Sequence, residues 1–436
     1  MKVSPFNSYI SLSDNRVLGY NSFHRRFIIL PQKISKVLQT YDINLMSNNL
    51  LHKISPETFQ LLKESGFIIN SGVDELSILD KELETINCCE SNAELHINPT
   101  LDCNFRCWYC YEEHMAGSKM SEEVLEAVKN YLNKTITQPL RHFRLSFFGG
   151  EPLLKFDSVC KPLIEEAAGL CAERGASFHT SFTTNSYLLT QDMADYLGRF
   201  SCGMQITLDG HREFHNKVRF APGGIGSYDR IISNVAMLAD VGVRVVLRIN
   251  YTLGNLESVS EIISDLKAQN IVESNKIVID FQRVWQDKHK GGDEKIKLLI
   301  KEYGRQLKEI GISYSLPDLH NPRVSSCYGD KKNYICVNYN GDFYKCTARD
   351  FKPERRAGHL APDGTLVWEP GRREAWEKAK FSREICRSCR IAPICLGGCR
   401  QRGLESPDDR RCPLGYDEAR KDELILQRFE HQYLND

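Results

Sequence analysis

Two dense groups of cysteines set this chain apart from an ordinary globular sequence. The 436 residues include 16 cysteines; three lie between residues 103 and 110, and eight lie between residues 327 and 412. Clustered cysteines in a chain without a secretion signal bind metal or carry out redox chemistry more often than they form disulfides. The placement therefore predicts metal centres. The five scattered cysteines are interpreted as small core residues: Cys88, Cys89, Cys160, Cys171 and Cys202.

The charge balance excludes several classes of partner. Lys plus Arg and Asp plus Glu both total 57, so the formal net charge is zero. A neutral chain offers no electrostatic basis for binding nucleic acid or an anionic membrane. No apolar run approaches the roughly 18 residues of a membrane-spanning helix, and the first residues lack the apolar core of a secretion signal. We therefore predict a cytoplasmic protein that binds neither nucleic acid nor membrane.

The chain is long enough for two or three domains, and its patterning changes along its length. Residues 1–92 mix short strand and helix patterns, which indicates a small α+β, winged-helix-like module. Residues 93–312 alternate six strand patterns with helical ones, which predicts a parallel sheet, either open and doubly wound or a partial barrel. Residues 313–415 are rich in Cys, Gly and Pro, and residues 416–436 form one predicted helix. The expected strands lie at 94–101, 142–150, 177–185, 202–210, 243–253 and 276–285, and expected helices include 121–135, 227–242, 256–269 and 294–310.

Polar turns follow several of these strands. The sequences are TLDC, FFGGEP, TTN and TLDG, after the first four strands in that order. Because the carboxyl ends of parallel strands meet at one edge of a sheet, these turns are expected to form a single site.

The turn after the first strand contains Cys103, Cys107 and Cys110 in a C-x3-C-x2-C spacing. Three thiolates on one loop can each hold one iron of a [4Fe–4S] cubane, which leaves the fourth iron without a protein ligand. An open metal position is where a substrate or cofactor can bind. The alternatives are a zinc site, with His114 as the next candidate ligand, or three buried cysteines without metal.

This loop resembles the signature of the radical S-adenosylmethionine (SAM) superfamily, with Tyr109 as the aromatic residue before the last cysteine. The turn FFGGEP resembles the glycine-rich turn whose backbone takes the methionine amino group of SAM in that superfamily. The resemblance implies a partial (β/α)6 TIM barrel and the reductive cleavage of SAM to a 5′-deoxyadenosyl radical. The residues expected to contact SAM are Tyr109, Gly149, Gly150, Glu151, Thr184, Asn185, Thr207, Arg219 and Arg248.

Further matches resemble the subfamily with C-terminal auxiliary clusters. His215 and Arg219 follow TLDG at the spacing DG-x4-H-x3-R. By resemblance, Thr207 and Arg219 contact the ribose and carboxylate of SAM, although an ordinary surface arginine is the alternative. Trp285, in FQRVWQ, is expected either to line the site or to pack in the core.

The C-terminal cysteines resemble the SPASM domain, which carries auxiliary [4Fe–4S] clusters. Cys327 begins a C-x13-G-x4-C pattern, a C-x2-C-x5-C-x3-C run follows from Cys386, and Cys412 comes last. The resemblance implies three [4Fe–4S] clusters in all. Auxiliary cluster I would be held by Cys327, Cys336, Cys346 and Cys399, and auxiliary cluster II by Cys386, Cys389, Cys395 and Cys412.

Cys336 is the one ligand in this set that the family pattern does not name. Two cubanes need eight thiolates, so we favour ligation by Cys336. Neither auxiliary cluster would then have an open iron, and electron transfer becomes the expected role. If Cys336 is only buried, cluster I is open to a substrate thiol; counting iron in Cys336→Ala by Mössbauer spectroscopy distinguishes the two.

Enzymes with a SPASM domain mostly modify ribosomally made peptides or proteins. The resemblance therefore implies a maturase that installs a thioether, C–C or C–O cross-link in a precursor peptide. The leader of that peptide would add a strand to the N-terminal module, although a purely structural cap on the barrel is the alternative. Flavodoxin or ferredoxin would be the reductant.

Two other functions are weighed against this one. A sulfatase-maturating, formylglycine-generating enzyme would carry an Asp directly after the third early auxiliary cysteine, where this chain has Thr347, with Asp350 nearby. An iron–sulfur electron carrier or regulator is the non-enzyme alternative. A carrier needs no GGEP turn or six-strand sheet, and a regulator should show a basic DNA-binding patch.

Overall fold

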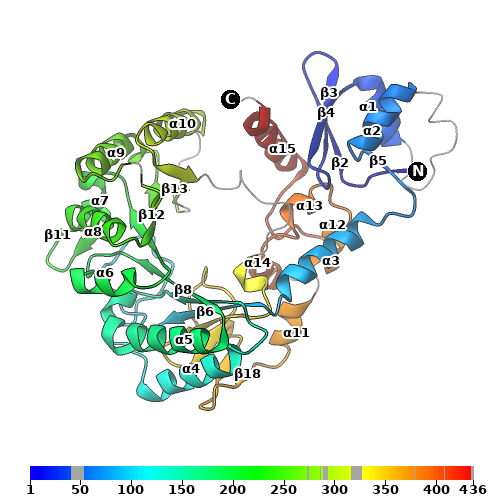
Figure 1. The fold of residues 1–436 in the computed structure, drawn as a ribbon. Helices are drawn as coiled ribbons and strands as arrows, with labels where there is room; N and C mark the ends of the chain where they lie inside the picture. The colour runs from blue at the N-terminus through cyan, green and yellow to red at the C-terminus, as the bar shows by residue number, and fades with distance from the viewer. Residues whose placement is uncertain are drawn as a thin grey trace. The chain divides into compact units, whose positions relative to one another are not determined.

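The computed structural model describes residues 1–40, 54–272, 274–284, 286–287, 293–315, 327–378, 380–406 and 408–433. The chain packs into two compact units, shown as a ribbon in Figure 1. The first unit comprises Met1–Cys88, Leu319–Lys332 and Glu374–Asp436, and the second comprises Cys89–Asp318 and Asn333–Arg373. The four-segment division expected from the sequence stays a prediction.

One large sheet forms the second unit. In the described residues it has eleven strands, in the order β14-β13-β12-β9-β8-β7-β6-β15-β16-β17-β18. The run from β14 to β15 is parallel, so the predicted α/β fold with a parallel sheet is confirmed. The six predicted strands are β6 (Asn92–Asn98), β7 (His142–Phe147), β8 (Ser177–Thr184), β9 (Cys202–Leu208), β12 (Arg244–Tyr251) and β13 (Ile277–Arg283), and β14 (Ser313–Ser315) follows.

Alternation along the strands gives the sheet an apolar and a polar face. Leu95 of β6 lies opposite Leu145 of β7, and both are fully buried in the main core. Their neighbours Glu94 and His96 point to the other face, as the two-residue period of a strand requires. Helices cover the apolar face, as Figure 1 shows: α4 (Glu122–Thr135), α5 (Lys161–Arg174), α6 (Gln191–Gly198), α8 (Tyr228–Asp240), α9 (Val259–Ala268) and α10 (Asp293–Glu309).

A meander extends the sheet beyond β6. Strand β15 (Tyr334–Asn338) runs parallel to β6, and β16 (Asp342–Tyr344), β17 (Gly358–Leu360) and β18 (Leu366–Trp368) follow antiparallel to one another. The irregular pattern expected from residue 313 onward therefore contains short strands. Only Gly fits at 358, because a Cβ there would lie 2.2 Å from the carbonyl oxygen of Val367.

The first unit contains the predicted N-terminal α+β elements. Strands β2 (Asn7–Ser11), β3 (Arg16–Asn21) and β4 (Arg26–Pro31) form an antiparallel sheet, and β1 (Lys2–Val3) pairs with β5 (Ile68–Ile69). The helices are α1 (Gln32–Thr40), α2 (Pro56–Glu64) and α3 (Glu75–Asn87). Helix α2 begins at Ser55, whose hydroxyl accepts from the amide of Thr58, the usual N-cap arrangement.

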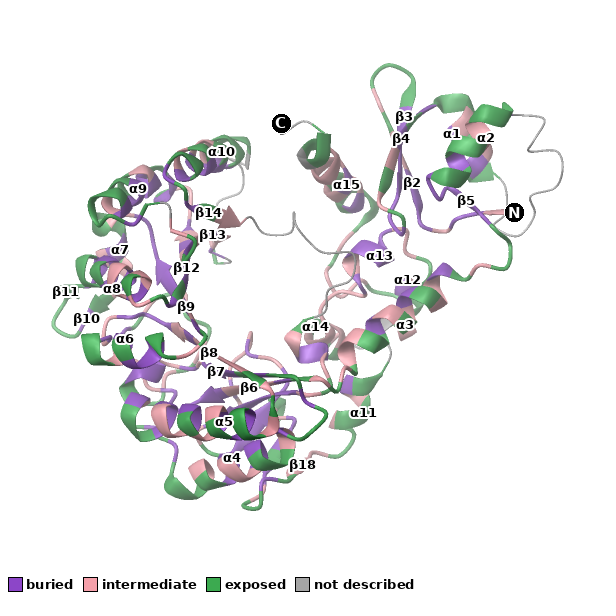
Figure 2. Cartoon of the chain, in the orientation of Figure 1, coloured by how far each residue is buried: buried purple, intermediate pink, exposed green. Residues whose placement is uncertain are grey.

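Residues from both ends of the chain share the cores of this unit. One face of the three-stranded sheet packs on α1 and α2 through Ile28, Leu38 and Leu62. Tyr20 packs with Ile425 of α15 (Glu418–Tyr433), the predicted C-terminal helix. Figure 2 shows this buried strip of α15 in purple and pink.

Helix α3 packs against the cysteine-rich C-terminal segment. Leu79 and Leu83 form one core with Phe381 and Leu396. Across the described residues, no helix combines the length and the apolar character needed to cross a bilayer.

Candidate cofactor site

The three-cysteine loop follows β6 and is closed at its base by hydrogen bonds. The hydroxyl of Thr100 donates to the carbonyl of Ser118 at 2.6 Å. The carboxylate of Asp102 accepts from the amides of Cys103 (2.8 Å) and Gly117 (3.0 Å). Phe105 is buried beneath the loop, so the cysteines are presented on a rigid support.

The GGEP turn after β7 packs directly on this loop. Gly149 and Gly150 have φ values of 75° and 38°, the left-handed region that favours glycine. A Cβ at Gly150 would lie 2.1 Å from the carbonyl oxygen of Asp102. The Gly150 amide donates to the carboxylate of Glu112 at 2.7 Å, and burial raises the pKa of that carboxyl to about 7. Bare backbone is therefore a packing requirement here.

Glu151 joins the GGEP turn to the end of β8. It is fully buried, and its carboxylate accepts from the Leu153 amide (3.0 Å), the Thr184 hydroxyl (2.6 Å) and the Asn185 amide (2.8 Å). Through these bonds, the Glu151 carboxylate links the GGEP turn to the turn that follows β8. Direct contact of Glu151 with SAM stays a prediction.

Asn185 completes the link back to the cysteines. Its Nδ2 donates to Oδ1 of Asn104 at 2.8 Å and lies 3.9 Å from the sulfur of Cys103. The Nδ2 of Asn104 is buried and has no hydrogen-bond acceptor among the described residues. The cysteine loop, the GGEP turn and the TTN turn thus form one cluster, with an unused donor beside Cys103.

Tyr109 connects the loop to the ends of β9 and β12. Its hydroxyl donates to the carboxylate of Asp209 at 2.6 Å and accepts from Nη2 of Arg219 (2.7 Å) and Nδ2 of Asn250 (3.1 Å). Arg219 also forms an ion pair with Asp209, which is 2% exposed. The surface alternative for Arg219 is wrong, because its side chain is only 12% exposed. Its contact with SAM stays a prediction.

Of the remaining predicted residues, Thr207 and Arg248 lie on β9 and β12, and His215 lies on α7 (Arg212–Val218). Thr207 is buried on β9, and Nε of Arg248 lies 3.1 Å from the carboxylate of Asp280. His215 is fully buried, accepts from the amide of Asp209 and pairs with the Ser227 hydroxyl. The prediction for Trp285 lies outside the described residues.

The thiols of the loop must lose their protons to bind metal. Burial raises the pKa of Cys103 to about 12 and that of Cys110 to about 11, so ligation must release protons. Zinc needs sulfur ligands at about 2.3 Å from one metal, whereas the thiolates of a cubane each reach a different iron. Ligation of an iron–sulfur cluster by these cysteines stays a prediction.

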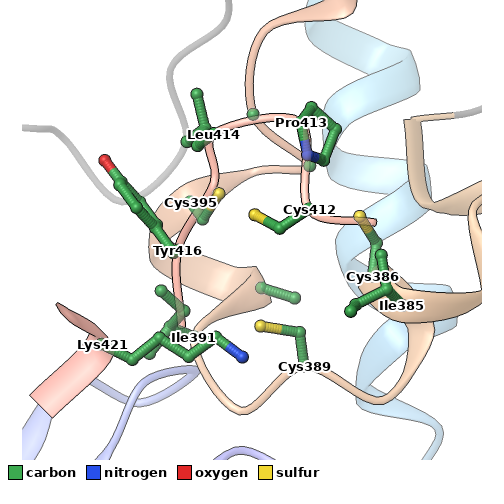
Figure 3. A pocket seen from close by; sticks show the side chains of 13 residues that line it. Ile385, Cys386, Cys389, Ile391, Cys395, Cys412, Pro413, Leu414, Tyr416 and Lys421 are labelled. Atoms are coloured by element: carbon green, nitrogen blue, oxygen red, sulfur yellow. The ribbon is translucent and has the colours of Figure 1, made fainter. Parts of the chain in front are cut away.

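A second set of four cysteines lines a pocket in the first unit. Cys386 and Cys389 come from the end of α12 (Glu384–Arg387) and the turn after it, Cys395 ends α13 (Ala392–Cys395), and Cys412 lies in a later loop. Figure 3 shows the four side chains around one space. Burial raises the pKa of Cys386 to about 11, with the neighbouring sulfurs of Cys389 and Cys412 adding to the effect. The four are the set predicted for auxiliary cluster II.

The four cysteines predicted for auxiliary cluster I are divided between the units. Cys327 and Cys399 belong to the first unit, where Nε of Arg400 lies 3.0 Å from the carboxylate of Asp330. Cys336 and Cys346 belong to the second unit, where Cys336 is fully buried, and burial followed by nearby negative charge raises its pKa well above the usual value. The ligand set of cluster I stays a prediction.

Several residues that shape the site escaped the sequence analysis. Asp209, Glu112, Asn104 and Asn98 all contact the motifs, the last through its position beside Gly149. Only Asp209 and Glu112 carried a signal, as charged residues directly after a buried strand or a ligand cysteine.

Comparison with known proteins agrees with this geometry. Residues 97–268 match the radical SAM superfamily. The chain is 23% identical over 267 residues to the radical SAM cyclopropyl synthase TigE of Paramaledivibacter caminithermalis, covering 55% of this chain and 54% of TigE. It is 22% identical over 345 residues to a cysteine-type anaerobic sulfatase-maturating enzyme of Clostridium perfringens, covering 72% of this chain and 90% of that enzyme.

Solved structures show the same fold. Streptococcus suis SuiB bound to S-adenosylmethionine aligns with a TM-score of 0.54 at 16% identity, covering 94% of this chain and 98% of SuiB. SuiB bound to its precursor peptide SuiA aligns with a TM-score of 0.51 at 14% identity and the same coverage.

The strands of the parallel sheet end around the three-cysteine loop. This arrangement is typical of enzymes that bind their cofactor at the open end of a partial barrel. Residues 97–268 carry the radical SAM domain, and the chain is a radical SAM enzyme. The family uses a [4Fe–4S] cluster and S-adenosylmethionine.

Proposed function

We propose that this enzyme is a peptide maturase that installs a cross-link in a ribosomally made precursor peptide. The main support for radical chemistry is that three motifs contact one another around the cysteine loop. Asn185 reaches Asn104 beside Cys103, Glu151 holds Asn185, and Gly150 packs on Asp102. These contacts would hold SAM and the cysteine-bound cluster in a fixed relation.

The chain's own residues would bind and orient the cofactor. Cys103, Cys107 and Cys110 would hold the cluster, and the bare backbone at Gly149 and Gly150 would leave room for the methionine end of SAM. Tyr109 would be kept in place by Asp209 and Arg219. When bound and reduced by one electron, SAM supplies a 5′-deoxyadenosyl radical that abstracts hydrogen from the substrate.

We also propose the two auxiliary clusters, which bring the total to three. The pocket lined by Cys386, Cys389, Cys395 and Cys412 supports cluster II, because four thiols surround one space. A fully ligated cluster has no open iron for substrate, so its proposed role is electron transfer from flavodoxin or ferredoxin.

The N-terminal sheet offers an edge where a leader peptide would add a strand. Among the described strands, β4 pairs only with β3, and its other edge is available. Ile29 of β4 is 47% exposed between the buried Ile28 and Leu30. Main-chain pairing with an apolar contact beside it is how extended peptides bind a sheet edge. A peptide substrate is consistent with SuiB, which was solved with its precursor peptide.

Formylglycine formation is the second candidate, because the sulfatase-maturating relative is covered over 90% of its length. The residues here do not favour it. Thr347 occupies the position expected for the catalytic Asp. The carboxylate of Asp350 lies 2.6 Å from Nη1 of Arg355 and 3.4 Å from Nζ of Lys352. The Asp350 carboxylate is therefore already engaged in two ion pairs.

Co-expression with a short peptide gene adjacent to this gene tests the proposed function. We expect mass spectrometry to show that the precursor peptide loses two hydrogen atoms, as a cross-link requires. With the Cys107→Ala enzyme, the mass of the peptide should stay unchanged. Ile29→Asp should reduce modification of the full precursor, since it places a charge on the β4 edge. Leu61→Asp is the matched control, because Leu61 is 46% exposed and lies on helix α2, outside the strands of the sheet.

The second candidate predicts a different outcome. If the precursor stays unmodified and the enzyme converts a sulfatase peptide to formylglycine, the second candidate replaces this proposal. Equal modification by Ile29→Asp and Leu61→Asp would remove β4 as the leader site.

A further inference from the structure

A buried lysine forms part of the wall of the four-cysteine pocket. Lys421 lies in the first turn of α15, is 7% exposed and lines the pocket together with Cys386, Cys389, Cys395 and Cys412. Figure 3 shows its ammonium group directed toward Cys389. Lysine is rarely buried to this extent unless its charge has a partner.

Lys421 lies among several charged side chains, and its ammonium group faces the pocket. Its Nζ lies 2.5 Å from the carboxylate of Glu418, whose side chain is 71% exposed and is therefore screened by water. The neighbouring Arg390 pairs with Glu418 and Asp422.

Packing of α15 fixes this lysine in place. Ile425, one turn further along the helix, is fully buried with Tyr20, Ile391 and Ile394. The ring of Phe429 lies 5.3 Å from that of Phe27 on β4, edge to face. These contacts hold α15 against the rest of the unit, with Lys421 of its first turn in the wall of the pocket.

We propose that Lys421 sets the reduction potential of the iron–sulfur cluster held by Cys386, Cys389, Cys395 and Cys412. The inference rests on the proposed function for the existence of that cluster. One-electron reduction adds one negative charge to the cluster, and a fixed cation beside it stabilises the reduced form. The lysine therefore raises the potential and makes the cluster a better electron acceptor.

The test is a redox titration, monitored by electron paramagnetic resonance, of the full-length reconstituted protein with dithionite as the electron source. Cys103, Cys107 and Cys110 are replaced by Ala in every sample so that the first cluster does not contribute. The signal that disappears on a further Cys389→Ser change belongs to the pocket. Lys421→Met removes the charge and keeps the bulk, and Lys421→Arg keeps the charge. Arg420→Met is the matched control, because Arg420 is exposed and pairs with Glu423.

We expect Lys421→Met to lower the equilibrium constant for reduction about tenfold, which is 59 mV for one electron. Lys421→Arg and Arg420→Met should stay near the parent potential. Equal potentials for Lys421→Met and Arg420→Met, with four irons retained at the pocket by Mössbauer spectroscopy, would overturn the role of Lys421. Absence of iron from the pocket in the parent protein would overturn the cluster itself and, with it, this role.

Discussion

The backbone of Gly150 packs directly on the cysteine loop. Its φ of 38° and the 2.1 Å approach of a Cβ to the Asp102 carbonyl mean that any side chain must displace the cysteine loop. We expect Gly150→Ala to lower SAM cleavage about 100-fold, the cost of misplacing a reacting group by about 1 Å. The measurement is the rate of 5′-deoxyadenosine formation in iron-loaded protein.

The control for this substitution is Gly223→Ala. Gly223 also has a positive φ, 81°, but a Cβ there meets nothing within 4 Å. Gly223→Ala therefore introduces backbone strain of about 1 kcal/mol without a clash. Equal rates for the two variants would show that the contact between Gly150 and Asp102 does not position the loop.

At this scale the sequence located the motifs better than it located the residues that contact them. The cysteines were identifiable because their spacing is specific, and Gly149 and Gly150 because they follow a strand. Asp209 was not identified as the partner of Tyr109, since the two residues are 100 positions apart. Pairing over such a distance depends on how β9 and the loop after β6 come together in three dimensions.

Among the structural elements, the loop before Cys412 depends on one arginine. Arg383 is 12% exposed in its side chain, and its guanidinium donates to the carbonyls of Gly403 (3.1 Å), Ser406 (2.8 Å) and Asp408 (2.5 Å). These bonds take the place of an apolar core in a segment that has few large side chains.

We expect Arg383→Met to release this loop and with it Cys412. The purified protein should then lose iron equivalent to one of the three proposed clusters, as measured by iron analysis and Mössbauer spectroscopy. Arg387→Met is the control, because Arg387 is exposed on the same short helix. Full iron content in Arg383→Met would mean that the loop holds its shape without the guanidinium.

Regular elements were predicted where the pattern was long and well capped. The six strands from β6 to β13 and helix α4, with Ser121 as its N-cap, all appear where their patterns indicated. Helix α5 was expected only as the helix that follows its strand, without bounds; its N-cap, Cys160, makes no side-chain hydrogen bond, and a π-helical turn (Phe156–Cys160) precedes it. Strands β16 to β18 have three residues each, too few for alternation to be recognised.

For the whole molecule, packing of the two chain ends into one unit was not visible in the sequence. Residues 1–88 share cores with residues 374–433, through Leu79 with Phe381 and through Tyr20 with Ile425. The residues in these two contacts are 302 and 405 positions apart in the sequence, and neither segment has a pattern that predicts the other as its partner. The proposed leader site on β4 and the proposed cluster II therefore belong to the same compact unit.

We propose that this chain cleaves SAM at a cluster held by three cysteines. The decisive assay incubates anaerobic, iron-loaded protein with dithionite and SAM and measures 5′-deoxyadenosine. We predict its formation by the parent protein and its loss in Cys107→Ala, which removes one of the three ligands. No 5′-deoxyadenosine from protein with complete clusters, or a single zinc ion bound by Cys103, Cys107 and Cys110, would contradict the claim.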